Sequence, residues 1–224
     1  MLLRLRGVLK DDELMLVHEW SAHARFVDGR LSAGTAAKRV KDNEEIDSGA
    51  AQLHRLNSLV MGGLTRHPVY RAAALPLHVA APHYARYRPG MSYGDHLDDP
   101  IMGADGLLYR SDIAITIFLN PPQAYGGGEL VVQTAFGDQT VKLPAGDAVL
   151  YPASSLHRVN PVTHGERAVA ITWAQSLVRD PARRELLYGL GAAREKLREA
   201  APDAIETAQV SAAYLNLIRM WSDI

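Results

Sequence analysis

Residues 93–100 read Tyr-Gly-Asp-His-Leu-Asp-Asp-Pro and follow a Pro-Gly turn, so one histidine stands among three aspartates. In a β-strand, residues i and i+2 point to the same face, which would set the side chains of His96 and Asp98 next to each other. An imidazole beside a carboxylate is a good pair of ligands for a divalent metal. The chain has no cysteine, so any metal must be bound through nitrogen and oxygen.

A third ligand is expected from a later strand. His157 is the best placed, because it follows an apolar strand and a turn of small residues. Two histidines and one carboxylate that leave three positions open form the facial triad of non-haem Fe(II) oxygenases. The alternative is an acidic, solvated loop, since a lone His-x-Asp often arises by chance.

Ten residues after His157, Arg167 opens the apolar run RAVAITWAQ. In a strand, Arg167 would share one face with the apolar side chains of residues 169, 171 and 173. A guanidinium in such surroundings needs an anionic partner, and a carboxylate fits its fork in a bidentate way. The partner is either a bound dicarboxylate or a carboxylate of the protein, unless Arg167 simply lies at the end of the strand.

The elements that must position these residues are mostly short strands. From about residue 75, apolar runs alternate with turns, and seven or eight strands spaced by 8 to 12 residues predict a sandwich or jelly-roll barrel. Before them we expect a strand over 2–9, a helix over 10–24, an irregular stretch with room for one strand over 27–47, and a helix over 48–65. After them, helical spacing returns over 181–200 and 203–221. We therefore expect an α+β protein with two units, a jelly-roll domain with N-terminal helices over 1–180 and a helical C-terminal module over 181–224.

The overall composition excludes some classes of partner. The chain has 224 residues, of which 47% are hydrophobic, and 24 basic residues nearly balance 25 acidic ones. The formal net charge of −1 gives no general attraction to nucleic acid or to an anionic membrane. No stretch has the roughly 18 apolar residues of a membrane span, and the N-terminus does not resemble a signal peptide. We expect a cytoplasmic protein without a nucleic-acid or membrane partner.

Taken together, these stretches resemble the Fe(II)/2-oxoglutarate-dependent dioxygenases, in particular the prolyl-4-hydroxylase-like group. That group carries Tyr-x-x-Gly-x-x-Tyr-x-x-His-x-Asp, then a distal histidine, then a basic residue about ten positions later. The series here is Tyr87, Gly90, Tyr93, His96, Asp98, His157 and Arg167. Residues 126–180 look similar to the distal half of the bacterial PKHD-type hydroxylases almost throughout.

The resemblance implies a role for each matching residue. It makes His96, Asp98 and His157 the iron ligands, and it makes Arg167 the residue that binds the distal carboxylate of 2-oxoglutarate. Tyr87 matches a tyrosine that helps to hold this cosubstrate. Tyr93 is a weaker candidate for the wall that faces the substrate, and the flanking residues 95 and 99 are expected in solvent.

The resemblance also implies a reaction: Fe(II), 2-oxoglutarate and O2, with ascorbate as an optional reductant, would hydroxylate a peptidyl or small-molecule substrate. The association of similar proteins with iron acquisition favours a siderophore or a related compound. Two alternatives stay open at this point, a cupin-type metal enzyme that does not use 2-oxoglutarate and a non-enzymatic β-sandwich that binds a metal or a sugar. The resemblance further implies a homodimer, and the C-terminal helices are either a dimerisation module or a lid on the barrel.

Overall fold

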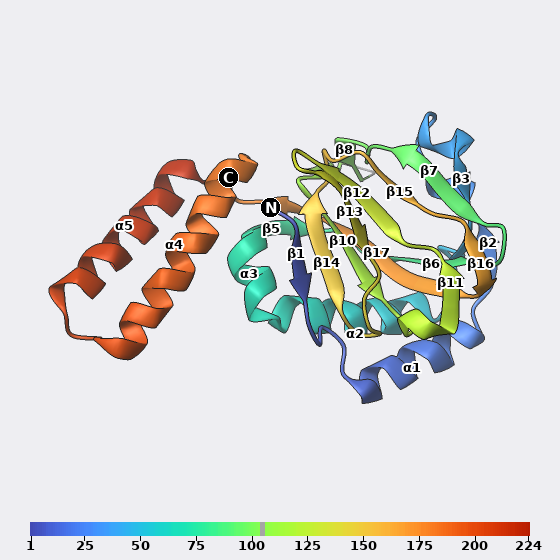
Figure 1. Cartoon of the computed structure of the whole chain (residues 1–224), viewed down its shortest axis with the longest axis horizontal. Helices are drawn as coiled ribbons and strands as arrows, with labels where there is room; N and C mark the ends of the chain where they lie inside the picture. Colours follow the sequence, from blue (N-terminus) through green and yellow to red (C-terminus); the bar gives the residue numbers. More distant parts are fainter. Residues whose placement is uncertain (104–105) are drawn as a thin grey trace.

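The computed structural model describes residues 1–103 and 106–224, in which two β-sheets face each other and helices pack around them (Figure 1). The strands are β1 (Leu3–Leu5), β2 (Phe26–Asp28), β3 (Lys41–Asp42), β4 (Glu44–Ile46), β5 (Pro76–Val79), β6 (His83–Tyr87), β7 (Ser92–His96), β8 (Ile101–Met102), β9 (Tyr109–Arg110), β10 (Ile113–Phe118), β11 (Tyr125–Gly127), β12 (Leu130–Thr134), β13 (Gly137–Val141), β14 (Ala148–Pro152), β15 (His157–Val159), β16 (Val162–Gly165) and β17 (Arg167–Ser176). The α-helices are α1 (Asp11–Ala22), α2 (Leu53–Arg66), α3 (Pro68–Ala74), α4 (Pro181–Ala200) and α5 (Ile205–Trp221). Short 3-10 turns are η1 (Gly29–Ser32), η2 (Ala37–Arg39) and η3 (Pro122–Ala124).

The two sheets form the predicted jelly roll. The larger sheet has the strand order β1-β14-β10-β17-β6-β4-β2, with β5 paired to β17, and the smaller has the order β13-β12-β15-β7-β3. Neighbouring strands in both sheets are antiparallel. Side chains of the two inner faces meet in one apolar cluster between the sheets.

Strand β10 shows why the larger sheet is central to the core, because all six of its residues are buried. Ile113, Ile115 and Ile117 join the apolar cluster that packs on the helices, whereas Ala114 and Phe118 join the cluster between the sheets. Successive side chains of a strand point to opposite faces. A continuous apolar run is therefore what a strand covered on both faces requires.

Helices α1 and α2 cover the outer face of the larger sheet (Figure 1). On α2, Leu56, Val60 and Leu64 repeat at intervals of four residues and are completely buried. This stripe packs into the same cluster as the outward isoleucines of β10. The two helices thus support the outer face of the larger sheet, and none of their residues lines the cavity described below.

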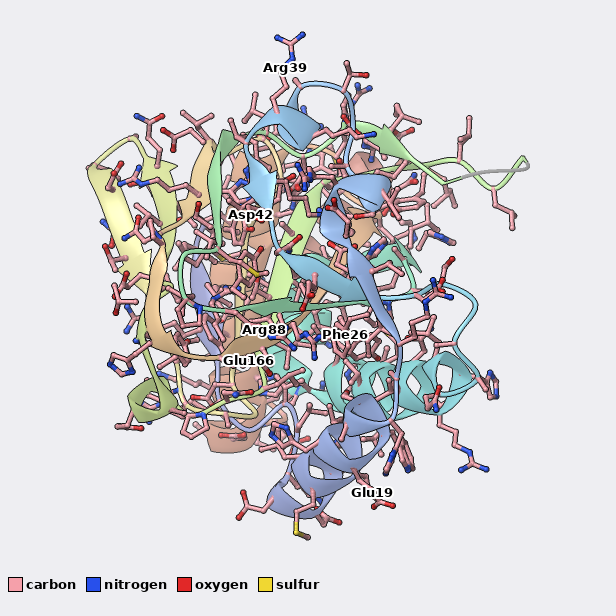
Figure 2. All side chains as sticks on the ribbon, turned by 90° about the vertical axis from the view of Figure 1, so that its right-hand side faces the viewer. Glu19, Phe26, Arg39, Asp42, Arg88 and Glu166 are labelled. Atoms are coloured by element: carbon pink, nitrogen blue, oxygen red, sulfur yellow. The ribbon has the colours of Figure 1, made fainter. Side chains whose placement is uncertain are left out.

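The N-terminal third differs from its sequence-based expectations in three places, one of which is that the helix expected over 48–65 begins only at Leu53, as α2. The strand expected over 2–9 is limited to β1, which pairs with β14. The stretch 27–47, expected to be irregular with room for one strand, contains β2, β3 and β4. Strand β3 pairs with β7 of the smaller sheet and β4 with β6 of the larger one, with only Asn43 between them. Residues 41–46 therefore cross from one sheet to the other along the edge seen in Figure 2, where Asp42 is labelled.

Helices α4 and α5 form a hairpin that extends away from the barrel (Figure 1). The Asp180 carboxylate caps α4 by accepting hydrogen bonds from the backbone N–H groups of Ala182 and Arg183. The Arg184 side chain is buried at the base, where it donates to the carbonyls of Val178 and Arg179. Within the described part of the chain, no helix combines the length and the apolar character that crossing a membrane requires.

Candidate active site

Neighbouring strands of the smaller sheet bring His96, Asp98 and His157 together. His96 ends β7, His157 begins β15, and the register of these antiparallel strands sets the two histidines opposite each other. Asp98 lies two residues beyond the end of β7, and its Oδ1 is 4.0 Å from Nε2 of His157. Each residue offers one ligand atom, and the three atoms lie within 4.8 Å of one another. The three predicted metal ligands thus form one cluster.

Backbone carbonyls orient both imidazole rings in the same way. Nδ1 of His96 lies 2.8 Å from the carbonyl oxygen of Gly94, and Nδ1 of His157 lies 3.0 Å from that of Ser155. A carbonyl can only accept, so Nδ1 carries the proton in each ring and Nε2 keeps its lone pair. Fixing the tautomer through the second ring nitrogen is the usual arrangement of a metal-binding histidine.

The charges of this cluster also favour a bound cation. Burial, and then the neighbouring His157, lower the pKa of His96 to about 3, so its ring is neutral at pH 7. Burial raises the pKa of Asp98, while His157 and Trp173 act in the opposite direction. Oδ2 of Asp98 is buried and has no hydrogen-bond partner among the described residues. A carboxylate oxygen in this position is costly to leave unpaired, and a metal among the three side chains would satisfy it.

Arg167 is the first residue of β17 and is only 1% exposed. Its guanidinium lies over the ring of Tyr87 at 4.9 Å and over that of Phe118 at 5.6 Å. Nε and Nη1 have no hydrogen-bond partner, and no carboxylate of residues 1–103 and 106–224 forms an ion pair with this side chain. The sequence left two anionic partners open for Arg167, a bound dicarboxylate and a carboxylate of the protein. Among the described residues, no protein carboxylate takes this role.

Tyr87 lies next to Arg167 because β6 and β17 pair in a register that sets these two residues opposite each other. The tyrosine is completely buried, and burial raises the pKa of its phenol to about 12. The hydroxyl therefore keeps its proton at neutral pH, and within the described chain it has no hydrogen-bond partner. Together, Tyr87 and Arg167 present hydrogen-bond donors that an anionic ligand could accept from.

Tyr93 stacks directly on His96, with ring centroids 3.5 Å apart and planes inclined by 11°. The stacking fixes the face of the imidazole and places the phenol in the wall of the cavity described next. The two flanking aspartates are exposed, and Asp95 pairs with Arg158 on the outside of the sheet. Asp99, although exposed, also lines this cavity, so of the two flanking residues only Asp95 lies away from it.

The cluster and Arg167 line one cavity of about 640 Å³, whose walls include residues of both sheets. This volume is within the range of small-molecule sites. Besides the site residues, its lining includes the mostly apolar or aromatic side chains of Val79, His83, Leu97, Met102, Tyr109 and Trp173. No described residue after Trp173 lines the cavity, so the C-terminal hairpin does not cover it as a lid.

Among the residues of the cavity wall that sequence reasoning missed are Lys41, Asn43 and Glu45. Nζ of Lys41 lies 2.6 Å from Oε1 of Glu45, and both side chains are more than nine-tenths buried. Burial alone would raise the pKa of Glu45, but hydrogen bonds from His83 and Lys41 and the charge of Lys41 outweigh it and lower the pKa to about 2. The signal in the sequence was an alternation of polar residues, Lys-x-Asn-x-Glu, inside a stretch that resembled a loop.

Comparisons with known proteins agree with this geometry. A family model described as the 2OG-Fe(II) oxygenase superfamily matches residues 82–175, and one described as the PKHD-type hydroxylase C-terminal domain matches residues 181–223. PKHD-type hydroxylases of Thioalkalivibrio sulfidiphilus and Hyphomonas neptunium are 52% and 44% identical over the whole of both chains. A solved prolyl hydroxylase of Trichoplax adhaerens, in complex with a hypoxia inducible factor peptide fragment, has a TM-score of 0.56 at 18% identity over 83% of this chain and 86% of that one. At that identity the structural likeness concerns the fold.

Proposed function

The chain belongs to the PKHD-type hydroxylases of the 2OG-Fe(II) oxygenase superfamily, and from this premise we propose which of its residues carry the reaction. It is an enzyme that uses Fe(II), 2-oxoglutarate and O2, as predicted. When bound, iron and cosubstrate supply the chemistry: 2-oxoglutarate is decarboxylated to succinate and carbon dioxide while one oxygen atom is inserted into a C–H bond of the substrate. The roles of individual residues are our proposal.

In this proposal, His96, Asp98 and His157 bind the iron. Two imidazoles and one carboxylate are a suitable donor set for Fe(II), and they leave the side that faces the cavity open. The carbonyls of Gly94 and Ser155 hold the rings in the required tautomer. The unpartnered Oδ2 of Asp98 supports the same assignment, because a cation removes the cost of burying it.

Arg167 and Tyr87 bind the cosubstrate in this proposal. The observation that carries it is the buried guanidinium of Arg167, which faces the same cavity as the metal cluster and has no carboxylate partner among the described residues. The distal carboxylate of 2-oxoglutarate would supply the missing charge in a bidentate pair. The protonated phenol of Tyr87 would donate a further hydrogen bond and help to orient the acid.

Anaerobic spectroscopy tests the cosubstrate site directly. Addition of 2-oxoglutarate to the Fe(II) protein should produce a visible charge-transfer band, which requires both to be bound at one centre. In Arg167→Ala, the concentration of 2-oxoglutarate that half-saturates this band should rise by about 100-fold, since losing one partner of a buried charge pair costs about 2–5 kcal/mol. Succinate release should show the same shift.

Arg158→Ala is the matched control, because Arg158 is a partly exposed arginine that follows His157 directly and pairs with Asp95 and Asp138. It should bind 2-oxoglutarate as the wild-type protein does. An unchanged half-saturation in Arg167→Ala would remove Arg167 from the cosubstrate site. A wild-type protein without the band would contradict the proposed site as a whole and favour the cupin-type alternative.

The substrate is of the peptidyl or small-molecule class. The association of similar proteins with iron acquisition supports a siderophore or a related compound, whereas the likeness to prolyl hydroxylases supports a peptide. We propose that the substrate, whether a small molecule or a peptide, binds in the part of the cavity near Tyr93. A screen for succinate release with mass detection of an added oxygen atom would distinguish the two.

We also propose that residues 1–180 and 181–224 are separate units and that the second serves to form a homodimer. Exposed apolar side chains on both helices of the hairpin, among them Leu186 and Met220, support this role. A location in the cytoplasm, the absence of a nucleic-acid or membrane partner and the use of ascorbate as a reductant stay predictions. None of them affects the assignment of the site residues.

A further inference from the structure

His83 is the first residue of β6, and its side chain lies on the inner face of the larger sheet. The register of β6 and β17 sets His83 opposite Ile171, four positions along the strand from Tyr87. Residues at even spacing in a strand share a face, so His83 and Tyr87 point to the same side. Tyr87 is completely buried, whereas the side chain of His83 is 43% exposed and lines the cavity.

The carboxylate of Glu45 fixes the orientation of this imidazole. Oε2 of Glu45 lies 3.4 Å from Nδ1 of His83, and Oε1 lies 2.6 Å from Nζ of Lys41. Although burial would raise it, the pKa of Glu45 is lowered to about 2 by His83 and Lys41, so the carboxylate is ionised at neutral pH. An ionised carboxylate only accepts hydrogen bonds. Nδ1 of His83 therefore carries the proton, and Nε2 of the neutral ring keeps its lone pair.

The edge of the ring that carries Nε2 lies across the ring from the edge that faces Glu45. The side chain of Glu45 is only 8% exposed, so the Nδ1 edge of His83 is the covered one. The exposed part of this half-exposed ring is then the edge formed by Nε2 and Cδ2. No described residue forms a hydrogen bond with Nε2, since the one hydrogen bond of this ring is made by Nδ1. The protein thus presents an oriented acceptor that it does not use itself.

This acceptor lies on the metal side of the cavity. The ring of His83 meets that of Trp173 edge to face, with centroids 5.6 Å apart. Trp173 is in turn close to Asp98, since its side chain opposes the rise in the Asp98 pKa that burial causes. Along β6, His83 is about 13 Å from Tyr87 at roughly 3.3 Å per residue. A molecule in contact with His83 would therefore lie beside the proposed iron site and away from the residues proposed to bind the cosubstrate.

We propose that His83 is a specificity-determining residue whose Nε2 accepts a hydrogen bond from an N–H or O–H group of the substrate, with Glu45 as its positioning residue. The inference rests on the proposed function and names a chemical property of its substrate. It also gives the buried pair of Lys41 and Glu45 a role, because Lys41 offsets the charge of a carboxylate whose second oxygen orients the imidazole. Amides, phenols and alcohols all offer such a donor, and this shared chemistry is what the site recognises.

The test uses pairs of small fragments in which a methyl group replaces the donor hydrogen. The pairs are N-methylacetamide with N,N-dimethylacetamide, phenol with anisole, and benzyl alcohol with benzyl methyl ether. Each is titrated into the anaerobic protein loaded with Fe(II) and 2-oxoglutarate at about pH 8, where imidazole side chains are normally neutral. In at least one pair, the donor should bind the wild-type protein about 5-fold more tightly than its methylated partner, which is the usual effect of one hydrogen bond.

His83→Phe keeps an aromatic ring beside Trp173 and removes the acceptor, so this preference should fall by about 5-fold. The pair that shows the largest fall identifies the source of the donor as an amide, a phenol or an alcohol. Equal ratios in the wild-type protein and His83→Phe for every pair, including the case in which no fragment binds, would overturn the inference.

His78→Phe is the matched control. His78 is a second exposed histidine that lines the same cavity, but its ring packs against that of Tyr109 at 5.1 Å and has no carboxylate partner among the described residues. Its removal should leave the preference for the donor fragment as in the wild-type protein. A fall equal to that in His83→Phe would show that the preference does not depend on the acceptor oriented by Glu45.

The tautomer of His83 can be measured without any fragment. Long-range proton–nitrogen NMR spectra of the protein loaded with Zn(II) in place of iron should show the proton on Nδ1, in signals that are missing from His83→Phe. In Glu45→Gln, whose carboxamide can donate as well as accept, this tautomer should lose population and the donor preference should weaken with it. A proton on Nε2 in the neutral wild-type ring would overturn the inference, whether or not the variants fold.

Failure of this inference can be told from failure of the proposed function. A missing charge-transfer band on adding 2-oxoglutarate contradicts the function. A normal band without a donor preference that depends on His83 contradicts only the role of His83.

Discussion

The cavity of the barrel and the hairpin of α4 and α5 differ in the kind of side chain that they leave without a partner. In the cavity wall the unpartnered groups are polar and buried, such as Oδ2 of Asp98, Nε and Nη1 of Arg167 and the carboxamide of Asn43. In the hairpin the buried polar group Arg184 is satisfied, whereas apolar side chains such as Leu186 and Met220 are 65% and 73% exposed.

This difference indicates what each region binds. An unpaired polar group in a buried position costs free energy that a small ligand of matching charge or hydrogen-bonding pattern can recover. Exposed apolar side chains are instead covered by another apolar surface. The cavity is therefore suited to a metal, an acid and a polar substrate, and the hairpin to a protein surface. Changes in one region should leave the function of the other intact.

The largest effect is expected from removing an iron ligand. In His157→Ala the cluster keeps one imidazole and one carboxylate, so iron affinity should fall by more than the roughly 10- to 100-fold that is typical of losing a group that only orients a ligand. Iron content after gel filtration and succinate release should both be lost. His164→Ala is the control, since His164 is exposed on β16 and lies outside the cavity. Equal iron content in the two variants would refute the metal assignment.

A smaller effect, on the free energy of unfolding, is expected from breaking the buried ion pair of Lys41 and Glu45. The pKa of Glu45 is about 2 against an ordinary 4.5, and a shift of this size corresponds to on the order of 3 kcal/mol at neutral pH. Because the folded-state pKa is the lower one, this stabilisation is complete above pH 4.5 and is lost as the pH falls toward about 2. Glu45→Gln, which leaves the buried Lys41 unpaired, should therefore be destabilised at pH 7 and much less so at pH 3, as measured by urea unfolding.

Glu44→Gln is the matched control for this prediction. Glu44 is the neighbouring residue, but its side chain is 27% exposed and it pairs with Arg86 and Arg88 at the surface. Pairs of this kind contribute about 0–1 kcal/mol. If both variants lost the same free energy of unfolding, or if the loss in Glu45→Gln did not depend on pH, the Lys41–Glu45 pair would not stabilise the fold.

Some residues of the cavity could be predicted from the sequence and others could not. His96 and Asp98 are two residues apart, and the alternation of a strand is enough to place their side chains together. Arg167 stood out because a charged residue opened an apolar strand. The jelly roll was predictable for a similar reason, since its strands are apolar runs separated by glycine and proline turns. In each case the signal was local in the sequence.

Asn43 and its neighbours had no such local signal. Strands β3 and β4 are two and three residues long, and they exist because β7 and β6 provide partners far along the chain. Their inward residues are polar, so the alternation that identifies a half-buried strand by hydrophobicity is missing. The length of β1 was overestimated for a related reason, because only Leu3–Leu5 find a partner strand in β14. Long-range pairing decides such short elements, and one sequence does not show it.

The smallest effect on the enzyme itself is expected from the hairpin, and it is the most direct test of the comparison. Leu186 lies near the start of α4 and Met220 near the end of α5, so the antiparallel helices place both at the same end of the hairpin. If this surface joins two copies of the chain, Leu186→Glu combined with Met220→Glu should raise the dissociation constant of the dimer by about 10- to 100-fold, because a charge would have to be buried at the contact.

Iron content and succinate release of that double variant should stay at the wild-type level, because no described hairpin residue lines the cavity. Lys196→Glu, a charge change at an exposed polar position of α4, should leave the dimer intact. Sedimentation velocity over a range of protein concentrations measures the association, and the same samples can be assayed for turnover. A double variant that dimerises normally would show that the exposed apolar groups of the hairpin have another partner. One that dissociates and also loses iron would show that the two regions are not independent, since the metal cluster would then depend on a contact made far from it.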